Sequence, residues 1–210
     1  MEIAFLLAAI ASVLAIVDPI GTLPFFTALT EGFSASDREV VVQRSIGVAG
    51  AVLAVFALFG RFLFAAFGFT LQAFEIAGGV LLFMVAYDML RGEITRTKLT
   101  PADREEALAR RDEIAVVPLG IPLLAGPGAI STVMIFEGNA GNDLLSVLAT
   151  FIAIAITVAV TYIVLHYGPA IVRSIGRIGV MAITRVLGLL LAAVAVQFIA
   201  NGVLGLLPHP

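Results

Sequence analysis

The stretch Asp18-Pro19-Ile20-Gly21 interrupts a long apolar segment near the start of the chain, and Gly126-Pro127-Gly128 interrupts another in the second half. A helix inside a bilayer satisfies its own backbone hydrogen bonds, so a break is tolerated only where the freed groups face protein, water or a ligand. Matched breaks in two halves of a chain are typical of the central binding site of a transporter. The two stretches therefore favour transport across a membrane over catalysis, and we expect no enzyme activity.

The composition indicates a polytopic helical membrane protein. The 210 residues are 60% hydrophobic and 13% charged, with a mean hydropathy of +1.10; soluble domains average about 25% charged residues. Three stretches, at 114–136, 144–172 and 186–208, contain no charged residue, and each exceeds the roughly 20 residues that span a bilayer. The absence of cysteine excludes disulfides and thiolate chemistry, and with two histidines we expect neither a metal site nor a cofactor.

Six membrane spans are expected, at residues 3–29, 41–66, 70–90, 114–136, 144–168 and 184–206. Ser36-Asp37-Arg38-Glu39 has the pattern of a capping box that starts the second helix. The polar segment 91–113 is expected to be a loop with a short helix at 102–111. Residues 168–182, with Arg173 and Arg177, have the pattern of an amphipathic helix at the membrane interface.

Lysine and arginine give the orientation, because these residues are enriched in cytoplasmic loops. Ten lie in the loops between spans one and two, three and four, and five and six, against Arg61 alone on the other side. We therefore expect a multi-pass protein of the cytoplasmic membrane with the 91–113 loop in the cytoplasm and both termini outside.

The two halves of the chain repeat the same order of features. Pro19 aligns with Pro127 at an offset of 108 residues, and each half is expected to contain three spans. Because three is odd, the second half must be inverted in the membrane, which is a common basis for alternating access. The predicted fold is all-α: six transmembrane helices as two inverted three-helix repeats, 1–92 and 114–210, joined by a polar loop at 93–113, with helices one and four broken.

The expected substrate site lies at the two breaks. Proline removes a backbone donor, glycine lets a ligand approach the backbone, and an acid such as Asp18 inside a membrane is by default a functional candidate. A half-helix beginning near Gly128 would present unpaired N–H groups to a carboxylate, while carbonyls before the break suit an ammonium or sodium ion. The candidate substrate-binding residues are Asp18, Pro19, Gly21, Thr22, Gly126, Pro127, Gly128 and Ser131.

Three charged residues are candidates for ion coupling or gating: Asp18, Glu75 and Arg185. Arg61 and Glu75 should lie at similar depth on adjacent helices, which favours a structural ion pair over a coupling site. Arg185 enters from the cytoplasmic side and is expected to pair with Asp18. Gly78-Gly79 and Gly188 are expected to let helix backbones approach closely.

The chain resembles the MarC family of six-span membrane proteins over nearly its whole length. The resemblance rests on the segments 18–24 and 122–130, on Glu75 with Ala77-Gly78-Gly79, and on 185–190. The family includes members described as transporters of small neutral amino acids such as glycine and alanine.

The resemblance and the breaks together imply a secondary transporter of small neutral amino acids, coupled to protons or sodium. Export of another small metabolite, an intramembrane lipid-handling enzyme and a regulatory membrane scaffold are the alternatives. The expected partners are the small-molecule substrate and the lipid bilayer, with no nucleic acid; the oligomeric state stays open.

Overall fold

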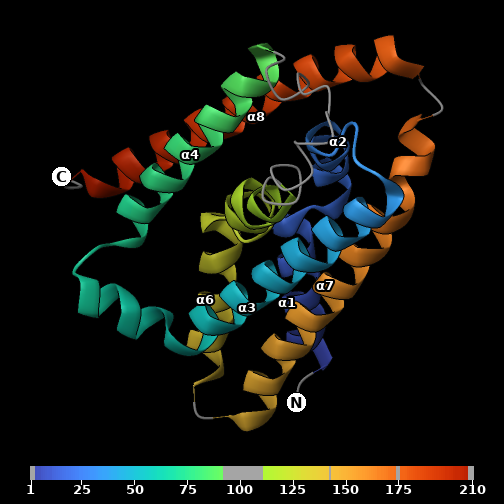
Figure 1. The fold of residues 1–210 in the computed structure, drawn as a ribbon. Helices are drawn as coiled ribbons and strands as arrows, with labels where there is room; N and C mark the ends of the chain where they lie inside the picture. Colours follow the sequence, from blue (N-terminus) through green and yellow to red (C-terminus); the bar gives the residue numbers. More distant parts are fainter. Residues whose placement is uncertain (1–2, 92–110, 142, 174–175, 208–210) are drawn as a thin grey trace.

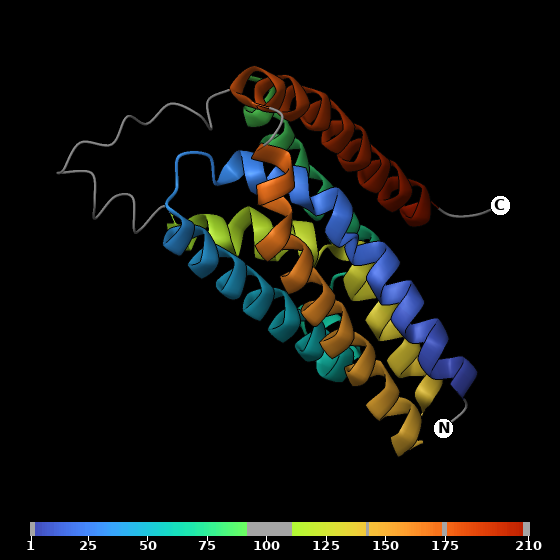
Figure 2. The same ribbon diagram turned by 90° about the vertical axis from the view of Figure 1, so that its right-hand side faces the viewer.

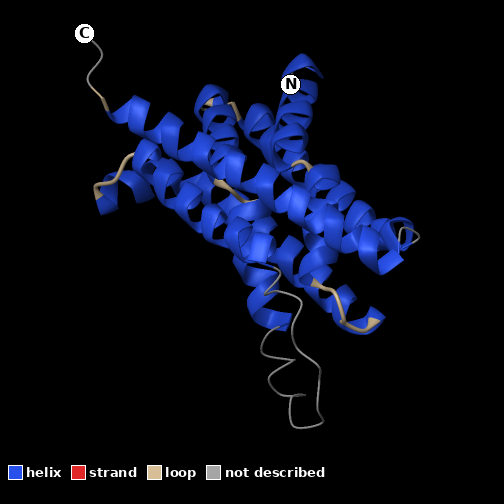
Figure 3. Cartoon of the chain, turned by 90° about the horizontal axis from the view of Figure 1, so that it is seen from above, coloured by secondary structure: helices blue, strands red, loops and turns tan. Residues whose placement is uncertain are grey.

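In the computed structural model, residues 3–91, 111–141, 143–173 and 176–207 are described, and within these ranges the chain is helical without strands (Figure 3). The all-α fold class is thereby confirmed. The elements follow in the order α1 (Ile3–Val17), α2 (Pro19–Leu29), α3 (Ala35–Phe67), α4 (Leu71–Arg91), η3 (Ala115–Leu124), α6 (Pro127–Ala140), α7 (Leu144–Arg173) and α8 (Gly176–Leu206). The helix expected at 102–111 lies almost wholly outside the described residues.

Four helical stretches of the described chain are long and apolar enough to cross a membrane: Ile3–Leu29, Ala35–Phe67, Leu144–Gly168 and Gly188–Leu206. The pair Arg111–Leu124 and Pro127–Ala140, bent by 58° at the second break, makes a fifth if it counts as one span. The apolar part of α4, Leu71–Tyr87, is shorter. Four to five spans are thus present by length and composition, and the six-span inverted repeat is consistent with this arrangement.

The N-cap of helix α3 lies two residues before the start of the expected capping box. The Ser34 side chain, at the N-cap, accepts a hydrogen bond from the Asp37 N–H at 3.1 Å, so the serine before Ala35 rather than Ser36 caps the helix. The helix ends at Gly68, whose positive φ of 69° suits a residue without a Cβ atom.

The separate interfacial helix expected at 168–182 is not found. Instead α7 continues to Arg173 and α8 begins at Gly176, so the segment is divided between the ends of two long helices. Basic residues four apart are also found in sequences where two spanning helices end near the membrane surface, so the spacing does not distinguish the two arrangements.

Helices α4 and α8 lie side by side along one edge of the molecule (Figures 1 and 2). Glycines make this close approach possible from both sides. A Cβ atom on Gly79 of α4 would lie 2.7 Å from the Ala195 carbonyl oxygen, and one on Gly202 of α8 would lie 2.6 Å from the Gln72 carbonyl oxygen. The packing role expected for Gly79 is confirmed, because any side chain there would push the backbones apart.

A second and larger body consists of α1, α3, α6 and α7 together with η3 and part of α2, and both η3 and α2 also contact the α4–α8 pair. Its buried core includes Val13, Phe26, Leu53, Leu119 and Leu165, drawn from five different elements. Phe25 and Ala28 of α2 belong to a separate buried cluster with Leu82, Ala86, Leu191 and Ala195 of the α4–α8 pair. Helix α2 therefore packs against both bodies.

The contacts between helices are consistent with the repeat that the sequence predicts. Helix α3 packs on α7, and α4 packs on α8, so corresponding elements of the two halves meet. The broken helix of each half also packs on the long helix of the other half: α1 and α2 lie on α7, while η3 and α6 lie on α3. Helix α1 begins and α8 ends toward the same side of the molecule (Figure 2).

Large apolar side chains cover the outer faces of the long helices. Phe62 of α3 is 70% exposed, and Ile163 of α7 and Leu189 of α8 are exposed to 55% and 64%. Soluble monomers rarely expose apolar surface on this scale. The outer surface therefore fits a hydrocarbon environment.

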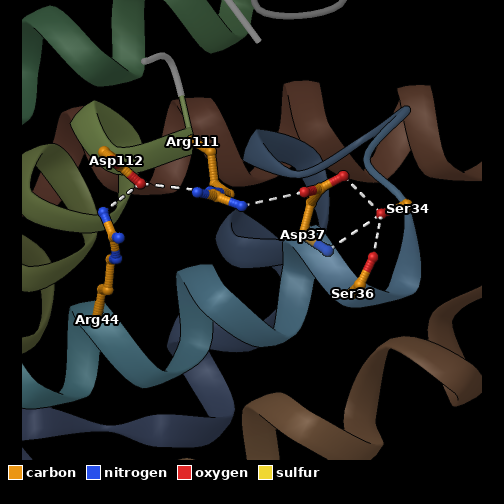
Figure 4. Close-up of polar contacts among 6 residues, drawn as sticks. All are labelled: Ser34, Ser36, Asp37, Arg44, Arg111 and Asp112. Carbon is orange, nitrogen blue, oxygen red and sulfur yellow. Dashed lines mark hydrogen bonds and ion pairs between the residues drawn. The ribbon is translucent and has the colours of Figure 1, made fainter. Parts of the chain in front are cut away.

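A polar cluster joins the start of α3 to the residues that precede η3 (Figure 4). Arg44 forms an ion pair with Asp112, and Arg111 contacts both Asp112 (3.3 Å) and Asp37 (3.2 Å). Asp37 also accepts a hydrogen bond from the Ser34 hydroxyl. The cluster ties the first half of the chain to the beginning of the second half.

Candidate functional site

The first break is built around the backbone of Asp18. This residue has φ 44° and ψ 72°, in the left-handed region that aspartate and asparagine tolerate best after glycine. The Asp18 N–H donates to the Leu14 carbonyl, and the Asp18 carbonyl accepts from the Thr22 N–H, both at 3.0 Å. These two helical hydrogen bonds are therefore kept at the break. Pro19 has no N–H to give the carbonyl four residues earlier, and the Gly21 N–H bonds to the Asp18 side chain.

The Asp18 side chain caps the half-helix that it precedes. Its Oδ1 atom accepts a hydrogen bond from the Gly21 N–H at 2.9 Å, and a Cβ atom on Gly21 would collide with the carboxylate. Gly21 is thus required by its contact with Asp18, and the N-terminus of α2 carries its own negative charge.

The second break turns the chain more sharply. Val117 and Ile121 have extended backbones inside η3, because each precedes a proline and the proline ring disfavours the helical region for the residue before it. Both of these X–Pro peptide bonds are cis. Gly126 then approaches the backbone closely: a Cβ atom there would lie 2.5 Å from the Pro122 carbonyl oxygen.

Helix α6 begins at Pro127, with Gly126 at the N-cap and no side chain capping its first N–H groups. Pro127 is favoured at this first position because it needs no acceptor. The next two N–H groups, of Gly128 and Ala129, stand at the positive end of the helix dipole. This confirms that a half-helix starts at the break.

Both breaks line one cavity of about 300 Å³, which we call the central cavity. The first half contributes residues at the α1–α2 junction and Leu82 of α4, and the second half contributes residues around the η3–α6 junction and four from α8. The lining consists of Ile16, Val17, Asp18, Gly21, Thr22, Phe25, Leu82, Pro122, Leu123, Gly126, Gly128, Ala129, Leu190, Leu191, Val194 and Phe198.

Polar groups in this cavity are few. The Asp18 carboxylate comes from the first half, and the uncapped start of α6 comes from the second. Thr22 is only 4% exposed as a residue and lines the cavity. Its hydroxyl is therefore a candidate donor or acceptor for a bound molecule.

The sequence profile of the MarC family of integral membrane proteins matches residues 3–207. The chain belongs to the MarC family. It is 38% identical over 207 residues to the UPF0056 membrane protein MJ1677 of Methanocaldococcus jannaschii, covering 99% of this chain and 100% of that protein. The UPF0056 membrane proteins YvbG of Bacillus subtilis (34%, 99% and 98%) and YhcE of Escherichia coli (33%, 92% and 89%) are similar over most of both chains. These names specify membrane proteins and no substrate. No solved structure matches the chain significantly.

Five of the eight substrate-site residues expected from the sequence of this MarC family member line the central cavity: Asp18, Gly21, Thr22, Gly126 and Gly128. The other three lie beside it without lining it. Pro19 and Pro127 are the first residues of the two half-helices and are buried. Ser131 lies one turn into α6, where its hydroxyl donates to the Pro127 carbonyl at 2.6 Å.

The apolar lining was not foreseen. Phe25, Leu82, Leu191, Val194 and Phe198 face the cavity, but in a membrane helix an apolar side chain toward a cavity has the same sequence pattern as one toward lipid. The only available signal is indirect: Phe25 lies one turn after Thr22 on the half-helix that begins at the break.

The prediction of an ion pair between Arg61 and Glu75 is wrong for the described residues. Neither residue forms a salt bridge with a described partner, and the Arg61 guanidinium lies instead against Gly138 of α6, in the space that a Cβ atom there would need. Similar depth in the membrane places two residues at one level, but it does not fix the direction in which each helix face points.

The expected ion pair between Asp18 and Arg185 is also not formed in this conformation. Asp18 bonds to the Gly21 N–H, and the described residues offer its carboxylate no basic partner. Arg185 lies on an exposed part of α8 and does not line the central cavity. The carboxylate is therefore available to a ligand on the cavity side.

Proposed function

We propose that this chain is a secondary transporter of small neutral amino acids, of the glycine and alanine class, with the substrate held in the central cavity. The observation that carries the proposal is that the two helix breaks, one from each half, line the same cavity with complementary charge. Ligand sites at the interface of two repeats, formed by broken helices, are typical of secondary transporters.

The chemistry of the cavity fits a zwitterion. The Gly128 and Ala129 N–H groups and the α6 dipole favour a carboxylate, while the Asp18 carboxylate favours an ammonium group through a charge-assisted hydrogen bond. The Thr22 hydroxyl is close enough along α2 to join Asp18 in binding, since the two are one turn apart. A purely anionic or purely cationic solute would satisfy only one of these groups.

Coupling to a proton or sodium gradient belongs to the same proposal. Asp18 is the lining residue whose charge a proton would remove or a sodium ion would balance. Glu75 and Arg185 lie outside the lining, and we assign them to gating. The proposed setting is the cytoplasmic membrane, with both termini outside, as the distribution of arginine and lysine predicts.

Uptake of labelled glycine and alanine into proteoliposomes tests the proposal, with a proton gradient and a sodium gradient imposed in turn. We expect saturable uptake or counterflow that is abolished by Gly128→Leu, which places a side chain in the cavity, and retained by Gly47→Leu. Gly47 is a matched control, because it lies on exposed α3 surface with nothing within 4 Å of an added Cβ atom. Absence of uptake and counterflow for every amino acid would overturn the proposal.

A further inference from the structure

A second, much smaller cavity lies among α1, α3, η3 and α7. Its volume is about 10 Å³, close to the roughly 10–15 Å³ that holds a single water molecule. Val17 and Leu124, the last residues of the segments that precede the two breaks, line it together with Thr157 and Thr161 of α7 and apolar residues of α3. We call it the threonine cavity.

Thr157 differs from two other buried threonines of the same helix. Thr150 and Thr161 each donate a hydrogen bond to the carbonyl one turn earlier, at 3.3 and 2.7 Å, and the Thr161 oxygen keeps its lone pairs for a further partner. Thr157 is 1% exposed, and its Oγ1 atom has no hydrogen-bond partner among the described residues. Because an unsatisfied buried hydroxyl is costly, the Thr157 oxygen calls for a bound partner inside the cavity.

The end of α1 brings negative partial charge to the threonine cavity. Carbonyls in the last turn of a helix have no partner within that helix, and the helix dipole places about half a negative charge there. A continuous helix would give the Gly21 N–H to the Val17 carbonyl, but this N–H bonds to the Asp18 side chain. Val17 lines the central cavity as well as the threonine cavity, so α1 ends between the two.

These groups suit a small hard cation. Hydroxyl and carbonyl oxygens are ligands of hard cations, and unwound carbonyls with the C-terminal ends of half-helices coordinate sodium in transporters built on broken helices. No carboxylate is among the described residues that line the cavity, so the site offers too little negative charge for a divalent ion. Sodium is smaller than potassium, which suits a cavity of this volume.

We infer that the threonine cavity binds a sodium ion, held by the Thr157 and Thr161 hydroxyl oxygens and by backbone carbonyls at the end of α1. The site is separate from the Asp18 carboxylate, which lines the central cavity. Because α1 ends at Val17 between the two cavities, a bound ion favours the conformation in which this break is formed. Binding of the ion does not depend on the amino acid, whereas its use in coupling rests on the proposed function.

Binding of radiolabelled sodium to the purified protein, without any amino acid, tests the inference. We expect saturable binding that an equal concentration of potassium does not displace. Thr157→Val replaces the hydroxyl by a methyl group and should weaken binding at least about tenfold, since a hydrogen-bonding group loses a charged partner; Thr157→Ser should retain binding. Thr150→Val is the matched control, because Thr150 is buried on the same helix outside the cavity lining. No saturable binding to wild type, or equal binding by the two valine variants, would overturn the inference.

Thermal unfolding gives a second readout. In potassium chloride, Thr157→Val should unfold at a temperature no lower than wild type, because it removes a buried hydroxyl that lacks a partner. Sodium chloride at the same ionic strength should raise the unfolding temperature of wild type, since the ion binds the folded state, and leave that of Thr157→Val unchanged. The same wild-type unfolding temperature in both salts would mean that water rather than sodium satisfies Thr157, and would overturn the inference.

The sodium site and the proposed function fail separately in these measurements. Sodium binding without uptake of any amino acid would remove the proposed function and leave the site. Amino acid uptake by a protein that does not bind sodium would remove the site and leave transport coupled to protons.

Discussion

Asp18 and Gly126 occupy equivalent positions 108 residues apart, each at the N-cap of a half-helix whose first residue is proline. The two positions differ in charge. Asp18 caps its own helix and brings a carboxylate into the central cavity, whereas Gly126 leaves the first N–H groups of α6 without a side-chain acceptor. Equivalent positions of the two halves thus differ in charge, which gives a zwitterion one favoured orientation.

Asp18→Asn should separate the charge of this residue from its structural role. Asparagine caps helices about as well as aspartate and tolerates the left-handed backbone, so thermal stability in detergent should change by less than about 0.5 kcal/mol. Glycine uptake should fall about tenfold or more, which corresponds to about 1.4 kcal/mol of lost interaction. Uptake at the wild-type level would show that the carboxylate does not bind the ammonium group.

Asp18→Ala removes the cap as well as the charge. We expect an additional loss of about 1 kcal/mol in the free energy of unfolding, because the Gly21 N–H loses its acceptor. Chemical denaturation in mixed micelles measures this difference. Equal stability of the Asn and Ala variants would contradict the capping role.

Gly128→Ala is the mildest test of close approach at the start of α6. The added methyl group would lie 3.2 Å from the Ile16 Cγ2 atom, so the Ile16 side chain must give way by a few tenths of an ångström. We expect reduced glycine affinity with small loss of stability, and complete loss of uptake with Gly128→Leu. Normal uptake by the leucine variant would place the substrate elsewhere.

Gly79→Ala should affect folding more than binding. Its methyl group would lie 2.7 Å from the Ala195 carbonyl oxygen, and backbone gives way less easily than a side-chain tip. Overpacking of this kind costs about 1–3 kcal/mol, whereas Gly47→Ala on exposed helix should stabilise by about 0.5–1 kcal/mol. Thermal unfolding of both variants, compared with wild type, distinguishes the two effects.

Arg111 should matter more to stability than Arg44. The Arg111 side chain is 17% exposed and contacts both Asp37 and Asp112, while the Arg44 side chain is 48% exposed. Arg111→Met should cost about 1.5–3 kcal/mol, because it removes hydrogen bonds between charged groups, and Arg44→Met no more than about 1 kcal/mol. Denaturant titration checks the order, and a reversed order would mean that the cluster does not join the two halves.

Membrane orientation can be measured with single cysteines, since the sequence contains none. Ser36 and Asn139 are exposed at the start of α3 and the end of α6. A membrane-impermeant thiol reagent should label a cysteine at position 36 only from the cytoplasmic side and one at position 139 only from outside. The opposite pattern would reverse the proposed topology.

The breaks were predictable because proline and glycine change the backbone itself. Pro19 and Pro127 remove donors whatever surrounds them, so the positions of both half-helices follow from the sequence. The close helix packing at Gly79 was predictable as well, because glycine lacks a side chain. Its neighbour Gly78 also packs closely, against Pro127. The pairing of side chains was less predictable. The sequence places Arg61 and Glu75 at similar depth in the membrane, but the packing of each helix sets its rotation and therefore the direction in which each side chain points.

The apolar half of the site lay beyond sequence reasoning. Phe198 and Leu189 are both apolar residues of α8, yet one faces the central cavity and the other is 64% exposed on the outer surface. In a soluble protein polar residues would mark the outer face, but in lipid both faces are apolar. Only the packing of α8 against α4 distinguishes them.

Equilibrium binding of labelled glycine to the purified protein tests the central claim, that one cavity recognises both ends of a zwitterion. Glycine, glycinamide and acetate compete in parallel against the wild-type protein and Asp18→Asn. We predict that glycine competes, that glycinamide and acetate each compete at least about tenfold more weakly because each lacks one charged group, and that Asp18→Asn weakens glycine binding far more than acetate binding. Glycinamide or acetate competing as strongly as glycine would contradict recognition of the zwitterion between Asp18 and the start of α6.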